Sequence, residues 1–123
     1  MELKEQRSGI PLISGYGDGG FRISGQRHNG HLLISAAGFS AWNVKSQKNI
    51  TKQSLKDIFK SKFKPEFLLL GLGEEVQDAV ILSRKLEKSL GLSCEVMTTG
   101  AAVRTYNVLV LEGRMLAAAI MAV

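Results

Sequence analysis

The segment TTGAAVR, residues 98–104, combines residue types that can hold an anion. Thr98, Thr99 and Gly100 are expected at the N-terminus of a helix, and Arg104 follows about one turn further on. Hydroxyl groups, free backbone amides, the positive end of the helix dipole and a guanidinium can together bind a carboxylate or a phosphate. The structural alternative is that the threonines cap the helix and Arg104 pairs with a neighbouring carboxylate or carbonyl.

A secondary anion-site candidate is GLGEE, residues 71–75, at a predicted strand-to-helix corner. Gly71 and Gly73 let backbone amides approach an anion closely. The lysine of a phosphate-binding loop is missing and two acidic residues follow at once, so tight-turn geometry is the alternative.

Other polar residues fit structural roles. Asp18 suits a turn, and Cys94 suits a small apolar position in a buried strand. His28 and His31 flank Asn29-Gly30, whose composition predicts a hairpin turn with exposed histidines. No third ligand is nearby in sequence, so neither a metal nor another cofactor is expected.

The N-terminal third is predicted to be mostly β. Residues 10–25 form two apolar stretches around a Gly-Asp-Gly-Gly turn, which predicts a hairpin, and residues 31–44 predict a second antiparallel pair around Ala37-Gly38. An amphipathic helix is expected over residues 51–63, capped by Asn49 or Thr51 and ended by Pro65. Its apolar face holds Leu55, Ile58 and Phe59, and Phe63 could extend it.

From residue 67 the pattern alternates between strands and helices. FLLLGLG at 67–73 predicts a strand buried on both faces, followed by a helix with Glu74 and Glu75 in its first turn. We expect this helix to end at Gly91 and to bury four apolar residues, Val76, Val80, Leu86 and Leu90. Strands are expected at 92–97 and 115–123.

The stretch from 98 to 111 has β-leaning members, but its caps and alanines favour a helix that ends near Gly113 and Arg114. Val103, Tyr106 and Val110 then share one face. The prediction is an α/β fold, a three-layer α/β/α arrangement with a mixed central sheet and an additional N-terminal β-hairpin region, built as a single domain over residues 1–123.

The charge is uneven along the chain. The formal net charge is +5, and the segment from Lys45 to Lys64 holds seven lysines and one aspartate. Solvated surface is one interpretation, and contact with an acidic partner or anionic lipid headgroups is another. Nucleic acid is not an expected partner, because aromatic residues do not interleave with the lysines as in a base-stacking surface. A single cysteine fits a reducing, cytoplasmic compartment, and no transmembrane segment is expected.

Four motifs, GYGDGGFRISG, LLLGLGEE, EVMTTGAAVRTYNVLVLEGR and AAAIMAV, resemble a family of small proteins of largely unknown function from bacteria and archaea. Its eukaryotic members include an assembly factor of mitochondrial respiratory complex I, and the resemblance runs from Ile13 to Val123. It implies the same three-layer fold. Where this chain has Thr98 and Val103, members of that family commonly carry Asp and Cys, so the resemblance implies that an acid and a nucleophile are missing here.

The resemblance adds Asn107 to the candidate site of Thr99, Gly100 and Arg104. The positions that match the family pattern are Thr99, Gly100, Arg104, Tyr106 and Asn107. It implies a non-enzymatic assembly or interaction factor for a membrane-associated complex, with protein partners, a possible homo-oligomer, and a cytoplasmic location peripheral to the inner membrane. The alternative is a small anion-binding protein, or an enzyme, that uses Thr99, Gly100 and Arg104.

Overall fold

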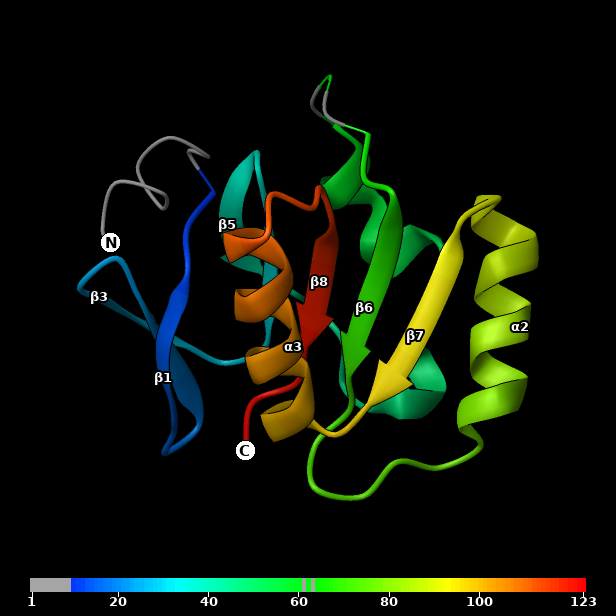
Figure 1. Cartoon of the computed structure of the whole chain (residues 1–123). Coiled ribbons are helices and arrows are strands. Elements are labelled where there is room, and N and C mark those ends of the chain that lie inside the picture. The colour runs from blue at the N-terminus through cyan, green and yellow to red at the C-terminus, as the bar shows by residue number, and fades with distance from the viewer. Residues whose placement is uncertain (1–9, 61, 63) are drawn as a thin grey trace.

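The computed structural model describes residues 10–60, 62 and 64–123, and their strands form two separate sheets (Figure 1). One is a three-stranded antiparallel sheet of order β1-β2-β3, and the other is a five-stranded mixed sheet of order β5-β4-β8-β6-β7. The strands are β1 Ile13–Gly17, β2 Gly20–Ile23, β3 Gln26–Asn29, β4 Leu32–Ser35, β5 Gly38–Ala41, β6 Phe67–Gly71, β7 Ser93–Met97 and β8 Ala117–Ile120.

The predicted central strand is β6, which pairs in parallel with β7 on one side and β8 on the other. Leu68, Leu69 and Leu70 are completely buried, because their side chains alternate between two apolar layers. β4 joins the other side of β8 in antiparallel orientation and carries β5 at the sheet edge. The mixed central sheet is confirmed.

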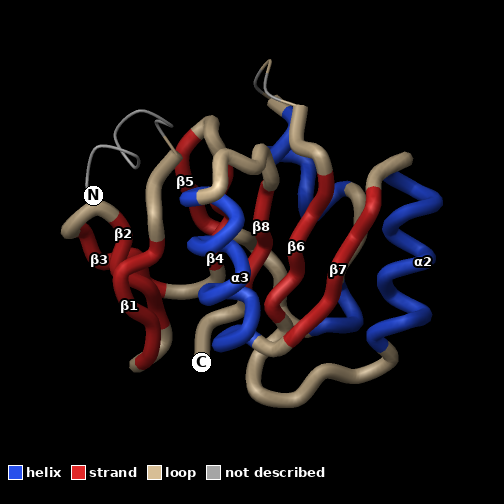
Figure 2. The backbone as a smooth tube through the Cα atoms, in the orientation of Figure 1, coloured by secondary structure: helices blue, strands red, loops and turns tan. Residues whose placement is uncertain are grey.

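Helices cover both faces of this sheet, which confirms the three-layer arrangement (Figure 2). Helix α3, Thr99–Leu111, lies on one face together with the three-stranded sheet. Helix α2, Ala79–Leu90, and the 3₁₀ helix η2, Gln53–Phe59, lie on the other. Side chains under α3, such as Tyr106 and Ile120, form one apolar core, and side chains under α2 and η2, such as Leu86 and Leu55, form a second.

The N-terminal hairpin of β1 and β2 is confirmed, with Asp18 and Gly19 at positive φ in its turn. β3 extends it to three strands, so the hairpin predicted at Asn29-Gly30 is wrong: β3 and β4 belong to different sheets. The Gly30 N–H donates to the Gly19 carbonyl at 2.8 Å, where the chain passes from one sheet to the other. His28 and His31 are half-buried at this crossing, not exposed.

The basic segment forms short 3₁₀ helices, η1 (Gln47–Asn49) and η2, instead of one α-helix over 51–63. With three residues per turn, η2 buries Leu55 and Ile58 on one side, and Phe59 is 39% exposed. The N-cap residue of η2 is Lys52, so neither Asn49 nor Thr51 caps it. Thr51, which lies just before η2, exchanges hydrogen bonds with Ser54 in its first turn. Phe63 lies outside the described residues.

Helix α2 begins at Ala79, so the prediction of Glu74 and Glu75 in its first turn is wrong. Residues 72–78 form a loop that the Gln47 side chain of η1 holds. Its Nε2 donates to the carbonyls of Leu72 and Glu75, both at 2.9 Å, and its Oε1 accepts from the Gln77 N–H. These bonds satisfy backbone groups that a helical turn would have used.

The apolar side of α2 is narrower than predicted. Leu86 is buried and Leu90 is partly buried, but Val80 is 62% exposed and Ile81 is 68% exposed. The helix ends as expected at Gly91, whose φ is 66°.

Helix α3 and strand β8 agree with the prediction. Thr98 is the N-cap of α3, and its side chain accepts from the Ala101 N–H at 3.4 Å. Val103, Tyr106 and Val110 are buried on the same face of α3. The alanines of β8 are fully buried. Ala118 belongs to the core under α3, where its small size lets the helix pack close to the sheet, and Ala117 and Ala119 belong to the core on the other face.

Candidate functional site

The predicted site lies at the carboxyl ends of β6 and β7, where α3 begins (Figure 1). Thr99 is 1% exposed, and both functions of its hydroxyl are used inside the protein. The hydroxyl donates to the Met121 carbonyl at 2.6 Å and accepts from the Gly73 N–H at 2.9 Å. The Thr99 N–H in turn donates to the Gly73 carbonyl at 2.8 Å. Thr99 therefore ties the ends of β6 and β8 to α3.

Gly71 and Gly73, the secondary candidates, each have a structural role that requires glycine. A Cβ at Gly71 would lie 2.8 Å from the Cβ of Ala102 and 2.9 Å from a methyl carbon of Ile120, so Gly71 allows α3 to approach the sheet. Gly73 has a φ of 85°, which favours glycine, and both its backbone polar groups bond to Thr99.

Gly100 and Arg104 lie at the surface, and Tyr16 of β1 joins them. A Cβ at Gly100 would lie 2.6 Å from the Tyr16 hydroxyl oxygen and 3.5 Å from an Arg104 guanidinium nitrogen. The hydroxyl and the guanidinium thus converge over the first turn of α3, which offers two hydrogen-bond donors beside the positive end of the helix. The sequence had not singled out Tyr16, because its place depends on how β1 docks against α3.

Asn107 does not share this surface, because its amide is bound to β1. The Asn107 Oδ1 accepts from the Ile13 N–H at 2.9 Å, and its Nδ2 donates to the Ile13 carbonyl at 2.7 Å. One residue earlier, the Tyr106 hydroxyl donates to the Pro11 carbonyl at 2.9 Å, and burial raises the pKa of Tyr106. Together these side chains fasten the N-terminal sheet to α3.

Cys94 offers little reactivity. Burial, with a smaller contribution from the carboxylate of Glu87, raises the pKa of the Cys94 thiol to about 11, so the thiol stays protonated at neutral pH. Within residues 10–60, 62 and 64–123, no group of three or more His, Cys, Asp or Glu side chains is placed to hold a metal ion.

A hollow of about 480 Å³ lies beside α3 on the same face of the sheet. Thr105 and Leu109 of α3 line one side of it. The rest of its lining comes from β6, β7 and the residues next to them, namely Glu66, Phe67, Leu69, Ser93, Glu95, Met97 and Arg114.

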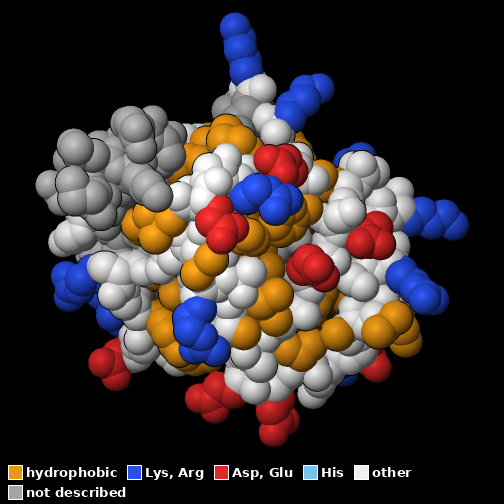
Figure 3. Space-filling model, in the orientation of Figure 1, with side chains coloured by type: hydrophobic (Ala, Val, Ile, Leu, Met, Phe, Trp, Pro, Cys, Tyr) orange, Lys and Arg blue, Asp and Glu red, His pale blue; other side chains and the backbone are white. Residues whose placement is uncertain are grey.

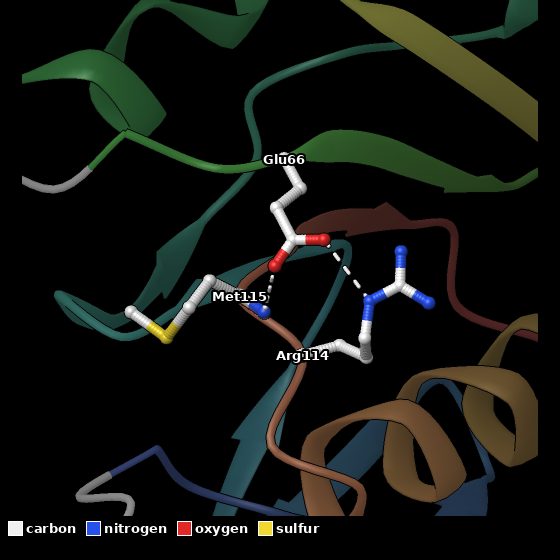
Figure 4. Close-up of polar contacts among 3 residues, drawn as sticks. All are labelled: Glu66, Arg114 and Met115. Carbon is white, nitrogen blue, oxygen red and sulfur yellow. Dashed lines mark hydrogen bonds and ion pairs between the residues drawn. The ribbon is translucent and has the colours of Figure 1, made fainter.

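Two of the lining residues, Glu66 and Arg114, form an ion pair (Figure 4). One oxygen of Glu66 accepts from the Arg114 Nε at 3.0 Å, and the other accepts from the Met115 N–H at 3.2 Å. These bonds, the one to Met115 first, lower the pKa of Glu66. The Arg114 guanidinium lies over the Phe67 ring, 5.6 Å from its centre.

The described lysines of the basic segment are all exposed, and Lys60 forms an ion pair with Asp57 at 2.8 Å. This is an exposed pair between neighbouring turns, so it adds little stability.

The profile of a family described as "Protein of unknown function (DUF498/DUF598)" matches residues 13–121. An uncharacterized protein from Rhodobacter capsulatus is 34% identical over 117 residues, which cover 93% of this chain and 86% of that protein. A solved structure from Rhodopseudomonas palustris, the Rpa2829 protein, superposes with a TM-score of 0.75 at 34% identity, covering 91% of this chain and 83% of that one.

A relative with a functional name is the NADH dehydrogenase [ubiquinone] 1 alpha subcomplex assembly factor 3 from Xenopus tropicalis. It is 32% identical over 120 residues, which make up 96% of this chain and 64% of that protein. The chain thus spans a little under two thirds of this relative's length. Because the family profile and these similarities extend over nearly the whole sequence, the chain belongs to the protein family of unknown function DUF498/DUF598.

Proposed function

We propose that this protein is a non-enzymatic interaction factor that assists the assembly of a membrane-associated respiratory complex. The observation that carries the proposal is the similarity to complex I assembly factor 3, which extends over 96% of this chain at 32% identity. The matched region includes both sheets and both α-helices of the fold, so the part shared with that relative is a whole structural unit.

The first turn of α2 offers a surface for a protein partner. Val80 and Ile81 are adjacent, and they are 62% and 68% exposed. Ile81 also lines a shallow hollow together with Ile50 and Leu82. Neighbouring aliphatic side chains at the edge of a hollow gain free energy when a partner removes them from water, about 25 cal/mol for each Å² of apolar surface.

The proposed location is the cytoplasm, at the periphery of the inner membrane. None of the helices in the described residues is long and apolar enough to cross a membrane. We propose that contacts at the protein surface hold it there, with the exposed lysines between Lys45 and Lys64 available for an acidic partner surface or anionic lipid headgroups.

The test is to capture partners from membranes of the source organism, using the tagged full chain after chemical cross-linking. We expect enrichment of subunits of the membrane-bound NADH:ubiquinone oxidoreductase. Ile81→Asp should reduce that enrichment, whereas Ser89→Asp, at an exposed position on the same helix, should leave it unchanged. If the wild-type chain enriches none of these subunits above a tag-only control, the proposal fails.

A second candidate function is the binding of a small anion at the start of α3. It is favoured by the convergence of the Tyr16 hydroxyl and the Arg104 guanidinium over Gly100. In such a site Thr99 would not contact the anion, because its hydroxyl is already bonded to Gly73 and Met121, and it would only hold the start of α3 in place.

Titration with inorganic phosphate or acetate, followed by NMR, tests this candidate. Amide shifts should concentrate at Gly100 and its neighbours, and Arg104→Ala should abolish them. Arg84→Ala, which removes an exposed arginine from α2, is the matched control. Equal shifts in the wild type and in Arg104→Ala would exclude this site.

A further inference from the structure

The solvent side of α3 carries an apolar ridge. Val108 and Leu111 are 53% and 43% exposed. Arg104 is also exposed and lies one helical turn before Val108 on the same side of α3. The opposite side of the same helix is the buried face that holds Tyr106 and Val110. A helix that is apolar on both sides is typically covered on both sides, so the ridge is suited to a contact with another surface.

The groove next to this ridge is the hollow between α3 and β7. On the α3 side of the sheet, β7 presents Ser93, Glu95 and Met97, and no other helix of the described chain lies over them (Figure 1). Phe67 and Leu109 add apolar surface to the groove. The space-filling view of this face shows hydrophobic side chains near its middle, with separate acidic and basic side chains around them (Figure 3).

The ridge and the groove carry opposite charges. Arg104 lies on the ridge and Glu95 lies in the groove, and neither side chain forms an ion pair or hydrogen bond with the described part of the chain. In contrast, Glu66 and Arg114 at the end of the groove are already paired with each other. One face therefore presents a ridge with an unpaired cation beside a groove with an unpaired anion.

A twofold-symmetric contact needs this kind of self-complementarity, because the same patch of each copy meets the other. If two such faces are related by a twofold axis that runs parallel to α3 between the ridge and the groove, the two α3 helices run parallel and each ridge faces the other copy's groove. Glu95 and Thr105 both line the groove, and Thr105 directly follows Arg104 along α3. Because an axis parallel to α3 leaves every residue at its own level along the helix, it brings each Arg104 toward the other copy's Glu95.

We propose that this face, defined by Arg104, Val108 and Leu111 on the ridge and Glu95 and Met97 in the groove, binds a second copy of the chain. The occupant is a homodimer partner whose ridge enters the groove, with two symmetry-related Arg104–Glu95 ion pairs. The inference is independent of the proposed function, because its test uses the purified chain alone.

Sedimentation equilibrium on the purified full chain measures the association. The average mass should rise from 13.4 kDa toward twice that value as the concentration increases from micromolar to millimolar. Arg104→Glu and Glu95→Arg should each weaken the dimer by about tenfold or more, because each places like charges opposite one another across the contact.

Mixing these two variants gives the decisive result. In a mixed dimer, the introduced Glu at 104 faces the introduced Arg at 95, and the native Arg104 faces the native Glu95, so both ion pairs are complementary. The equimolar mixture should therefore recover dimerisation close to the wild-type level. Val108→Asp should also weaken the dimer, whereas Ser89→Asp, which places the same charge at an exposed position on α2, should not.

Two results would overturn the inference. One is a wild-type chain that remains at 13.4 kDa over the whole concentration range. The other is a dimer that tolerates Arg104→Glu and Glu95→Arg separately or is not recovered by mixing them. Circular dichroism of each variant, recorded alongside, shows whether a loss of dimer reflects a loss of fold.

Discussion

Replacing Thr99 by Val tests whether this threonine holds the fold together or serves a ligand. The two side chains have nearly the same shape, so the change removes the hydroxyl without opening a large cavity. The hydroxyl donates to Met121 and accepts from Gly73, and Thr99 is 1% exposed. The Met121 carbonyl is buried and cannot readily bond to water instead, whereas the Gly73 N–H is only partly buried.

The expected cost follows from those two bonds. A typical hydrogen bond contributes about 0.5–1.5 kcal/mol, and a buried polar group left without a partner costs about 1–3 kcal/mol. Thr99→Val leaves two such groups, which would cost about 2–6 kcal/mol together. Because the Gly73 N–H is less buried than the Met121 carbonyl, we expect the lower half of this range, about 2–4 kcal/mol. Thr99→Ser keeps the hydroxyl and loses one methyl group, so it should cost about 1 kcal/mol.

Urea unfolding, followed by the fluorescence of the single tryptophan, gives the free energy directly. Trp42 is 2% exposed, so its emission should change on unfolding. Thr99→Val should lower the midpoint by roughly 1–2 M urea. Thr105→Val is the matched control, because Thr105 is only half-buried and lies on the same helix. A loss below about 1 kcal/mol for Thr99→Val would refute the structural role.

Three further predictions concern packing, pH and thiol reactivity. Gly71→Ala should cost about 1–3 kcal/mol of stability in the same unfolding assay, because its Cβ would lie 2.8 Å from that of Ala102, and adding Ala102→Gly should recover part of the loss. An unchanged midpoint in Gly71→Ala would contradict this packing argument. Burial lowers the pKa of His31 below 6.5, and its Nδ1 accepts from the Ala122 N–H at 2.9 Å, so the folded state favours the neutral ring. Stability should therefore be full above pH 6.5 and decline as the pH falls below it, as measured by thermal unfolding; His31→Asn, whose Oδ1 can replace Nδ1, should flatten this dependence. A wild-type profile that is equally flat would argue against the His31 contribution. Because the thiol of Cys94 has a pKa raised to about 11, iodoacetamide at mildly alkaline pH should modify the native protein at least about 100-fold more slowly than the urea-unfolded chain, as followed by mass spectrometry. Comparable rates would show that the thiol is accessible and ionised in the folded state.

Strongly patterned elements were predictable from the sequence. The apolar run at Leu68, Leu69 and Leu70 could only be accommodated between two apolar layers, and it forms the middle of β6. Thr98 caps α3 through its own side chain, a bond that depends on residues three apart in sequence. Local interactions of this kind are present in the sequence pattern itself.

Elements that depend on distant partners were not predictable in the same way. The start of α2 was placed too early because the loop before it is held by Gln47, about 30 residues away. His28 and His31 were assigned to a hairpin because the pattern does not reveal that β3 and β4 join different sheets. At the candidate site, the partners of Thr99 and the approach of Tyr16 likewise depend on tertiary packing.

The hydrogen bonds from Gln47 to the loop at 72–78 also determine how this loop opens in the native state. All three hydrogen bonds come from one side chain, so a single rotamer change in Gln47 releases them together. The loop should then open as one cooperative unit with a lower free energy than global unfolding. In native-state hydrogen exchange, the Gln77 amide should exchange well before those of β6, and Gln47→Ala should accelerate it without affecting the amides of the central strand.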